Sequence, residues 1–419
     1  MQYDTDFFGL DIANVQRSKS EECCDACASY SGCGAFTWSD FNGGTCWLKS
    51  AAGQASHKPG SHSAIVNVVN PPKTHIQYRM RTGEIPLKSV NLGAWLVGEY
   101  WMSYTSPAWK SAWDYAYKGE MAVMRGLGHG RGDGQFEEHR RSWITEEDIR
   151  QIAAAGLNSN DDMRTFAPGG LKYLDKLINE WAVKYNLAVM LSCHAHQGSQ
   201  NGYDHSAPPN LGQISWGWPE SVESSLQLVT FLAARYKLSP AFLGMNLMNE
   251  PALGINVGTL INYYYEAYRR VRATGNDCIL VTSPLLQRQG PNEMTDLMRW
   301  PAYNNVWHEF HLYFKWGIYE NMNEWEVMNQ ARQYRNNNLN PWPGNYLYMG
   351  EWALCSPEKN AKFENLDTLR QFGAIQLEQF KGAHSGWAFW SWKHGDEGTL
   401  LSRGWSLREM LRLNVLNFK

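Results

Sequence analysis

Short apolar runs alternate with stretches of helical periodicity along the chain from about residue 78 onward. Eight runs are strand candidates, namely 90–96, 156–163, 188–193, 244–248, 278–282, 306–313, 347–352 and 386–392. Helical stretches separate many of them, for example 145–155, 171–185 and 221–236. Eight strands that alternate with helices predict an α/β protein with a (β/α)8 TIM barrel. The alternative, a doubly wound open sheet, is disfavoured because no glycine-rich phosphate loop follows the first run.

The run 156–163 is the weakest of the strand candidates. It contains Asn158, Asn160, Asp161 and Asp162. Such polar residues are poor choices for a buried central strand. We therefore expect a second strand that is remodelled relative to the other seven.

The first 69 residues are rich in serine, glycine and cysteine, and contain short strand-like runs such as 35–38. The stretch 70–73 then reads Asn-Pro-Pro-Lys, and consecutive prolines cannot continue a helix or a central strand. We predict a small module over residues 1–69, a linker over 70–77 and the barrel domain over 78–419.

Five of the eight cysteines fall within the first 46 residues. They are Cys23, Cys24, Cys27, Cys33 and Cys46. A dense cluster in a short segment predicts a disulfide framework in an oxidising compartment. Zinc is the alternative, but the spacing lacks two CxxC pairs and nearby histidines, so we expect no metal. The remaining cysteines are scattered, and we expect them to be buried; they are Cys193, Cys278 and Cys355.

The net charge and the first residues of the chain limit which partners and which cellular location we expect. The net charge of −3 argues against nucleic acid and against an anionic membrane surface as partners. No apolar run approaches the ~20 residues of a membrane span. Residues 1–6 are polar and do not form a signal peptide. With the cysteine cluster, this predicts a secreted or cell-wall protein whose secretion signal is not part of this chain.

The chain is rich in aromatic residues, with 20 tryptophans and 21 tyrosines. Large cores explain this composition, because buried aromatic rings carry much apolar area. A sugar-binding cleft explains it as well, since flat rings stack on the apolar faces of pyranoses. The composition by itself leaves both explanations open.

Two of the predicted strands end in a carboxylate. The fourth ends in Asn249 and Glu250, and the seventh ends in Glu351. Functional residues of a TIM barrel lie at the carboxyl ends of its strands, and a buried carboxylate is costly unless it has partners or a task. One such glutamate could form an ordinary loop salt bridge. Two at one barrel mouth suit glycoside hydrolysis, with one as acid and one as nucleophile.

Several separated motifs extend this pattern. They are 91–99 (NLGAWLVGE), 143–148 (WITEED), 198–204 (GSQNGYD), 311–313 (HLY) and 389–393 (FWSWK). With the two glutamate motifs, residues from about 88 to 419 resemble the exo-β-1,3-glucanase branch of glycoside hydrolase family 5. The resemblance implies a retaining enzyme that releases glucose from β-1,3-glucan ends, without a metal or an organic cofactor. The expected partner is a β-glucan oligosaccharide or polysaccharide.

The resemblance also implies a role for each matching residue. Glu250 would be the acid/base, Asn249 would bind the sugar 2-hydroxyl, and Glu351 would be the nucleophile. The other implied site residues surround the sugar: His311 and Tyr313 orient the nucleophile, His194 ends the third strand, Glu99 and Asp204 bind the terminal sugar, Tyr203 and Trp316 clamp the next unit, and Trp390 or Trp392 forms the platform. Alternate strand residues face opposite sides, so one of these two rings faces the barrel interior and the other faces the helices. The sequence does not decide which, and Trp390 is the preferred candidate.

The second strand departs from this family. The family carries there an arginine that supports the nucleophile, and Arg164 is the candidate for a displaced equivalent. Without it, activity would be weak or lost. A non-catalytic glucan-binding or cell-wall structural protein is therefore the alternative to an exo-acting hydrolase, and transglycosylation or action on β-1,6-glucan is a variant of the enzyme.

The N-terminal segment resembles a PAN/Apple module. The resemblance rests on the segments 21–27, 32–38 and 45–49. It implies a Cys27–Cys33 disulfide and a second link to Cys46 from Cys23 or Cys24. The cysteine left over would pair in the family with one that precedes Tyr3, which is not in this chain. Such modules bind carbohydrate or protein, and a passive stabilising appendage is the alternative.

Overall fold

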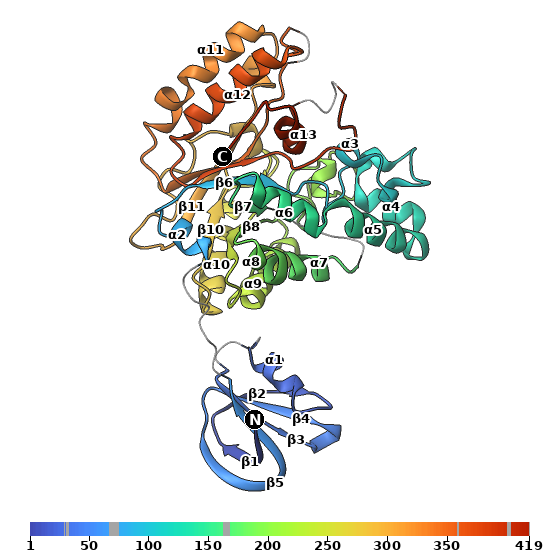
Figure 1. The fold of residues 1–419 in the computed structure, drawn as a ribbon, viewed down its shortest axis with the longest axis vertical. Helices are drawn as coiled ribbons and strands as arrows, with labels where there is room; N and C mark the ends of the chain where they lie inside the picture. The colour runs from blue at the N-terminus through green and yellow to red at the C-terminus, as the bar shows by residue number, and fades with distance from the viewer. Residues whose placement is uncertain are drawn as a thin grey trace. The chain divides into compact units, whose positions relative to one another are not determined.

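The structure is a computed structural model, and it describes residues 1–28, 30, 33–66, 75–161, 168–357, 360–399 and 404–418 (Figure 1). The chain divides into two compact units, which are described separately. The first contains an antiparallel sheet near the N-terminus, and the second contains a parallel barrel.

The larger unit is a closed barrel of eight parallel strands. The strands are β6 (Leu87–Asn91), β7 (Ser159–Asp161), β8 (Ala188–Ser192), β9 (Phe242–Asn246), β10 (Ile279–Thr282), β11 (Val306–Leu312), β12 (Tyr346–Trp352) and β13 (Gly386–Phe389). β13 pairs with β6 and closes the barrel. The predicted (β/α)8 barrel is confirmed.

Helices surround the barrel strands (Figure 1). Their bounds are α2 (Ile76–Arg81), α3 (Tyr100–Ser103), α4 (Glu120–Leu127), α5 (His129–Trp143), α6 (Glu146–Ala154), α7 (Leu171–Lys176), α8 (Ala182–Lys184), α9 (Pro219–Tyr236), α10 (Val257–Ala273), α11 (Glu324–Tyr334), α12 (Leu366–Phe380) and α13 (Leu407–Arg412). Polar caps fix several helix starts. Thr145 and Asp148 form a reciprocal capping box at α6, so the helix begins where the sequence motif places its threonine.

The weak second strand exists and is short. β7 spans only Ser159–Asp161, and it pairs in parallel with β6 on one side and β8 on the other. These two ladders satisfy the backbone groups of a segment whose side chains are unsuited to a core strand. Residues 162–167, which include the arginine candidate Arg164, lie outside the described residues.

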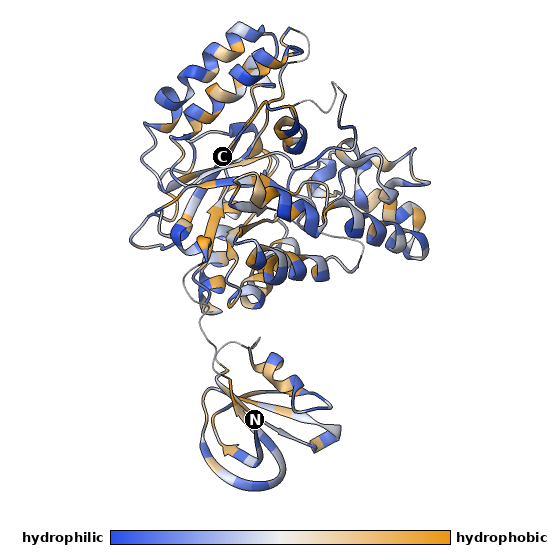
Figure 2. Ribbon diagram, viewed as in Figure 1, coloured by the Kyte–Doolittle hydropathy of each residue, from blue (hydrophilic) through white to orange (hydrophobic). Residues whose placement is uncertain are grey.

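The barrel core lies in the first part of the strands. It includes Leu87, Met190, Leu243, Val281 and Tyr348. Figure 2 shows hydrophobic residues on the barrel strands and mixed polar and apolar residues along the surrounding helices. Because this packing fills the amino-terminal half of the barrel, the carboxyl ends are left to carry polar side chains.

The smaller unit is a five-stranded antiparallel sheet with the order β1-β5-β3-β4-β2. Its elements are β1 (Gln2–Phe8), β2 (Asp11–Gln16), α1 (Glu22–Ala28), β3 (Ala35–Ser39), β4 (Thr45–Lys49) and β5 (Gln54–Ile65). Disulfides join Cys23 to Cys46 and Cys27 to Cys33, as the resemblance implied. Cys24 is half-buried and forms no disulfide, since it follows Cys23 on the helix by a rotation of about 100°.

The start of the barrel unit differs from the predicted boundary. Of the predicted linker 70–77, residues 70–74 lie outside the described residues, whereas His75 belongs to the barrel unit. Its buried side chain accepts a hydrogen bond from the backbone N–H of Gln77 and caps α2. The barrel unit therefore includes residues 75–77, because a helix cap ties them to it.

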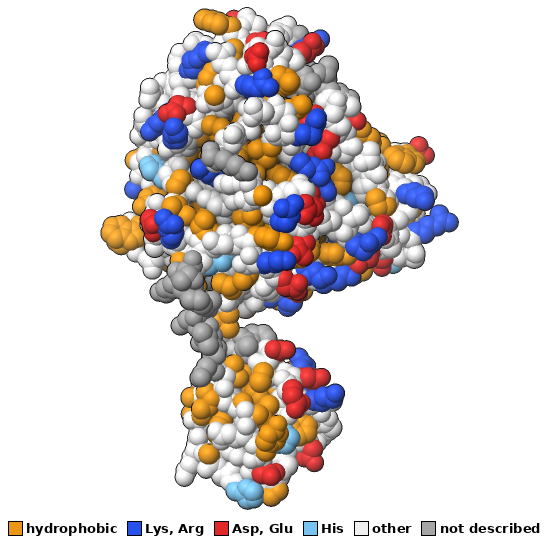
Figure 3. Space-filling model, viewed as in Figure 1, with side chains coloured by type: hydrophobic (Ala, Val, Ile, Leu, Met, Phe, Trp, Pro, Cys, Tyr) orange, Lys and Arg blue, Asp and Glu red, His pale blue; other side chains and the backbone are white. Residues whose placement is uncertain are grey.

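The distribution of surface charge and the apolarity of the helices bear on whether the protein binds nucleic acid or crosses a membrane. Figure 3 shows Lys and Arg interspersed with Asp and Glu on the face in view, without a field of one sign. None of the helices in the described part of the chain has the length and apolarity needed to cross a bilayer.

Candidate active site

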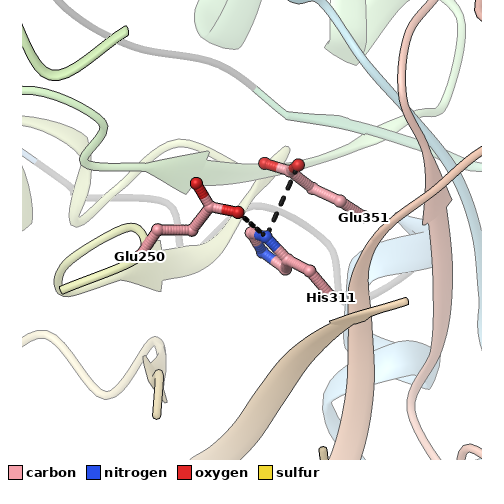
Figure 4. Close-up of side chains that lie close together, drawn as sticks. All are labelled: Glu250, His311 and Glu351. Atoms are coloured by element: carbon pink, nitrogen blue, oxygen red, sulfur yellow. Dashed lines mark hydrogen bonds and ion pairs between the residues drawn. The ribbon is translucent and has the colours of Figure 1, made fainter. Parts of the chain in front are cut away.

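The strand ends bring two buried glutamates and a histidine together (Figure 4). Glu250 follows β9, His311 lies near the end of β11, and Glu351 lies near the end of β12. His311 Nδ1 lies 2.7 Å from Glu250 Oε1 and 3.4 Å from Glu351 Oε2. An oxygen of each glutamate and a nitrogen of the histidine all lie within 4.8 Å of one another.

The backbone around Glu250 is held in an uncommon conformation. Glu250 has φ of +47°, in the left-handed region that non-glycine residues rarely adopt. The side-chain amide of Asn201 donates to the carbonyl of Glu250 at 3.1 Å, and that of Gln200 donates to the carbonyls of His194 and Asn249 at 2.6 and 2.8 Å. The 198–204 motif thus fixes the turn that aims Glu250 into the barrel mouth.

Glu351 is held by a tyrosine and by histidines. The Tyr313 hydroxyl donates to its Oε2 at 2.6 Å, and His194 Nε2 lies 3.8 Å from its Oε1. Within the described ranges, its ion pairs are with His194 and His311. No arginine of this part of the chain lies within ion-pair distance of Glu351.

The electrostatics distinguish the two glutamates. Burial opposes ionisation of both, but the hydrogen bond and positive charge of His311 outweigh it at Glu250 and lower its pKa to about 2. At Glu351, burial and then the charge of Glu250 raise the pKa to about 8 against the opposing charge of His311. Burial also disfavours the charged imidazole of His311, yet the carboxylates raise its pKa well above its usual value. Burial and the neighbouring charges thus favour an ionised Glu250 and a protonated Glu351, the reverse of the distribution that the resemblance implies.

The pair opens into a cleft of about 1390 Å³. Most of the predicted site residues line it: Glu99, His194, Tyr203, Glu250, His311, Tyr313, Trp316, Glu351 and Trp390. Asn249 and Asp204 do not line it. Asn249 is buried, and neither Nδ2 nor Oδ1 has a hydrogen-bond partner among the described residues.

Glu99 lines the cleft, and Asp204 lies near enough for its charge to act on Glu99. Glu99 is buried and accepts a hydrogen bond from Trp101 Nε1 at 2.9 Å. Burial and then the nearby charge of Asp204 raise the pKa of Glu99 well above its usual value. These two carboxyl groups therefore share a negative environment that suits hydroxyl donors.

The two candidate platform tryptophans face different sides. Trp390 lies in the cleft, and its ring stacks on His194 with centroids 5.4 Å apart. Trp392 is buried, and its Nε1 donates to Asp148 Oδ1 at 2.9 Å. Trp390 is thus the one of the two that a sugar in the cleft could contact.

The cleft residues that sequence reasoning missed include Trp101, His205 and Trp405. His205 directly follows the 198–204 motif, and Trp101 lies two residues beyond the 91–99 motif, so reading each motif further would have found both. Trp405 belongs to no motif. Its ring lies 5.3 Å from Trp101 and 5.5 Å from Tyr313, a contact that only the fold creates.

Comparison with known proteins agrees with this geometry. Residues 140–396 match the family model for cellulase (glycosyl hydrolase family 5), and residues 5–49 match the PAN domain. A probable glucan 1,3-beta-glucosidase A of Emericella nidulans is 29% identical over 385 residues, which cover 78% of this chain and 89% of the relative. A probable glucan endo-1,6-beta-glucosidase B of Neosartorya fischeri is 24% identical over 367 residues, which cover 79% of this chain and 86% of the relative. The crystal structure of rutinosidase from Aspergillus niger shares the fold, with a TM-score of 0.67 at 17% identity over 80% of this chain and 99% of that chain.

Proposed function

Because this chain belongs to glycosyl hydrolase family 5, we propose that it is a retaining glycosidase that releases glucose from the ends of β-1,3-glucan chains. One observation carries the proposal: two buried glutamates lie with carboxylate oxygens within 4.8 Å at the mouth of a parallel barrel. That spacing suits a retaining pair, in which the nucleophile attacks the anomeric carbon from one face and the acid protonates the leaving oxygen on the opposite face. A relative named as a glucan 1,3-beta-glucosidase supports the substrate.

The mechanism uses the two glutamates in turn. Glu351 attacks the anomeric carbon while Glu250 protonates the leaving oxygen, which gives a glycosyl-enzyme ester and a free sugar end. Glu250 then takes a proton from water, and that water cleaves the ester. These steps need no cofactor. They do require the single proton of the pair to move from Glu351 to Glu250 when substrate arrives, which a glycosidic oxygen placed beside Glu250 favours.

The surrounding residues would hold the sugar. Asn249 offers an unpartnered donor and acceptor to the 2-hydroxyl, where the developing charge strengthens hydrogen bonds. Glu99 and Asp204 would accept hydroxyls of the terminal sugar, and Trp390 would lie under the ring. Tyr203 and Trp316, about half exposed at the cleft, would contact the next glucosyl unit.

Two other readings have a specific observation behind them. Action on β-1,6-glucan is favoured by a relative named as an endo-1,6-beta-glucosidase. A non-catalytic glucan-binding protein is favoured by Glu351, whose ion-pair partners within the described ranges are histidines rather than an arginine. Transglycosylation follows the same first step, with an acceptor sugar in place of water.

The location and the module are part of the proposal. Two disulfides in the PAN module support an oxidising compartment, outside the cell or in the wall. We place a carbohydrate or protein ligand on that module.

Glucose release tests the catalytic proposal. Wild type, Glu250→Gln and Glu351→Gln are compared on laminarin, a β-1,3-glucan, and pustulan, a β-1,6-glucan. We expect wild type to release glucose from laminarin, and both variants to lose at least about a thousandfold in rate. A wild-type protein that binds laminarin in calorimetry without cleaving it would establish the non-catalytic alternative, and faster release from pustulan would reassign the linkage.

A further inference from the structure

His205 lies beside Glu250 on the side that His311 does not occupy. His311 Nδ1 lies 2.7 Å from Glu250 Oε1, and His205 Nε2 lies 3.7 Å from the other oxygen, Oε2. His205 belongs to the short 3-10 helix η5 (Asp204–Ser206). The two oxygens of this carboxyl group therefore face two different histidines.

The imidazole of His205 is held in place by rings. Tyr203 stacks on it with an interplanar angle of 6° and centroids 5.6 Å apart. The ring of His194 lies edge-on at 6.4 Å. The His205 side chain is 19% exposed, compared with 4% for His311. His205 can thus exchange protons with solvent at a position where its charge is felt by Glu250.

The position of His205 matters because of where the catalytic proton must lie. Oε1 of Glu250 accepts the hydrogen bond of a cationic His311, so the proton given to the leaving oxygen must be carried on Oε2. A neutral His205 permits a proton there, whereas an imidazolium 3.7 Å away opposes it. Because the two glutamates carry one proton between them, a charged His205 drives that proton from Glu250 to Glu351, where it blocks the nucleophile. We propose that His205 is a positioning residue that controls which glutamate holds this proton and thereby sets the acidic limb of the pH–rate profile.

This inference rests on the proposed function and concerns the same site. The other titratable groups that face Glu250 among the described residues are His311, His194, Glu351 and Tyr313. The pKa of His194 is lowered by burial to about 3, and that of His311 is raised well above its usual value by the carboxylates despite its burial. Near pH 6, where a histidine ordinarily titrates, His194 therefore stays neutral and His311 stays charged.

A pH–rate comparison tests the proposal. kcat/KM for laminaribiose is measured from pH 3 to 9 for wild type, His205→Asn and His205→Gln. A unit charge 3.7 Å away moves a neighbouring proton equilibrium by about 0.8 pH units in water and about 3 at an effective dielectric of 20. We therefore expect the acidic midpoint to fall by about one pH unit or more in both variants. Midpoints that coincide in all three proteins would overturn the inference.

A second substrate and a second histidine serve as controls. Dinitrophenyl β-glucoside has a leaving group that needs no proton, but its hydrolysis still requires an ionised Glu351. Its acidic midpoint should therefore fall together with that of laminaribiose when His205 is replaced. An unchanged midpoint with this substrate would contradict a shift of the proton to Glu351. His394 also lines the cleft, and its Nδ1 accepts from the backbone of Asp396. His394→Asn should leave the acidic midpoint for laminaribiose unchanged, and an equal shift there would count against His205.

A titration without turnover separates the two proposals. The ring signals of His205 are followed by NMR in wild type and in Glu250→Gln, and assigned by their loss in His205→Asn. We expect these signals to respond to pH differently in the two proteins, because a carboxylate 3.7 Å away favours the charged imidazole. Equal midpoints would refute the coupling. A wild type that hydrolyses nothing would contradict the proposed function, and this comparison would still decide on His205.

Discussion

Replacement of Tyr313 by phenylalanine tests how this site supports its nucleophile. The Tyr313 hydroxyl donates to Glu351 Oε2 at 2.6 Å; Glu351 is buried and Tyr313 is half-buried. A hydrogen bond to a charged group contributes about 1.5–3 kcal/mol. Since the bond favours the ionised carboxylate, its loss raises the pKa of Glu351 further and weakens the attacking charge. Tyr313→Phe should therefore lower kcat/KM by about 10- to 150-fold.

The pH dependence gives this prediction its sign. The bond lowers the pKa of Glu351 against the effect of burial, so the variant should lose more activity at pH 5 than at pH 8. The matched control is Tyr173→Phe, which removes a 2.8 Å hydrogen bond from a tyrosine to the carboxylate of Glu137 outside the cleft. Rates are measured with dinitrophenyl β-glucoside, which isolates the nucleophile from the acid. A Tyr313→Phe variant within twofold of wild type at every pH would refute this account of Glu351.

Three further predictions concern the pKa of Glu351, the two tryptophans that follow β13 and the disulfide of Cys46. The pKa of Glu351 is raised from 4.5 to about 8, so the folded protein binds more protons than the unfolded chain between these pH values. Tm should therefore fall as pH rises from 4.5 to 8, and Glu351→Gln should reduce this fall. An equal slope of Tm against pH in wild type and variant would contradict the prediction. Trp390→Ala should weaken laminaribiose binding about tenfold or more in calorimetry, whereas Trp392→Phe, which loses a bond to Asp148, should lower Tm and keep the affinity. Cys46→Ala opens a disulfide that spans 23 residues and should destabilise the module by about 3 kcal/mol, seen as earlier tryptic cleavage within residues 1–66 in a urea series, while glucose release persists.

The sequence predicted the features of the fold that depend on the local pattern of residues. It did not predict the contacts that depend on the direction in which a side chain points. The barrel was predictable because buried strands read as apolar runs, and β7 was uncertain because its sequence is polar, although its backbone pairs with both neighbouring strands. Cys23 and Cys24 are neighbours in the sequence, so the rotation of α1 decided which of them meets Cys46. Trp390 and Trp392 differ in the same way, by the side of the strand each one faces.

The charge distribution in the pair was beyond the sequence for a related reason. Both glutamates follow apolar strands, and nothing in their motifs distinguishes which one is ionised. The difference comes from His311, whose Nδ1 lies 2.7 Å from Glu250 and 3.4 Å from Glu351. The position of this imidazole depends on tertiary packing rather than on residue type, so the sequence does not disclose which glutamate it favours as the ionised one.

The reversed charge distribution need not move the two titration midpoints of the pair. One proton on the pair is the state required for catalysis, and the lowered pKa of Glu250 and the raised pKa of Glu351 keep one proton on the pair between these midpoints wherever that proton rests. The location of this proton in the free enzyme affects kcat/KM instead. Substrate must bind to the minor form with the proton on Glu250, and each factor of ten in that population lowers kcat/KM tenfold. A low kcat/KM within a broad, normal pH profile would thus indicate a proton resting on Glu351. A variant that weakens the hold of His311 on Glu250 while keeping its charge should then raise kcat/KM without moving either midpoint of the pair.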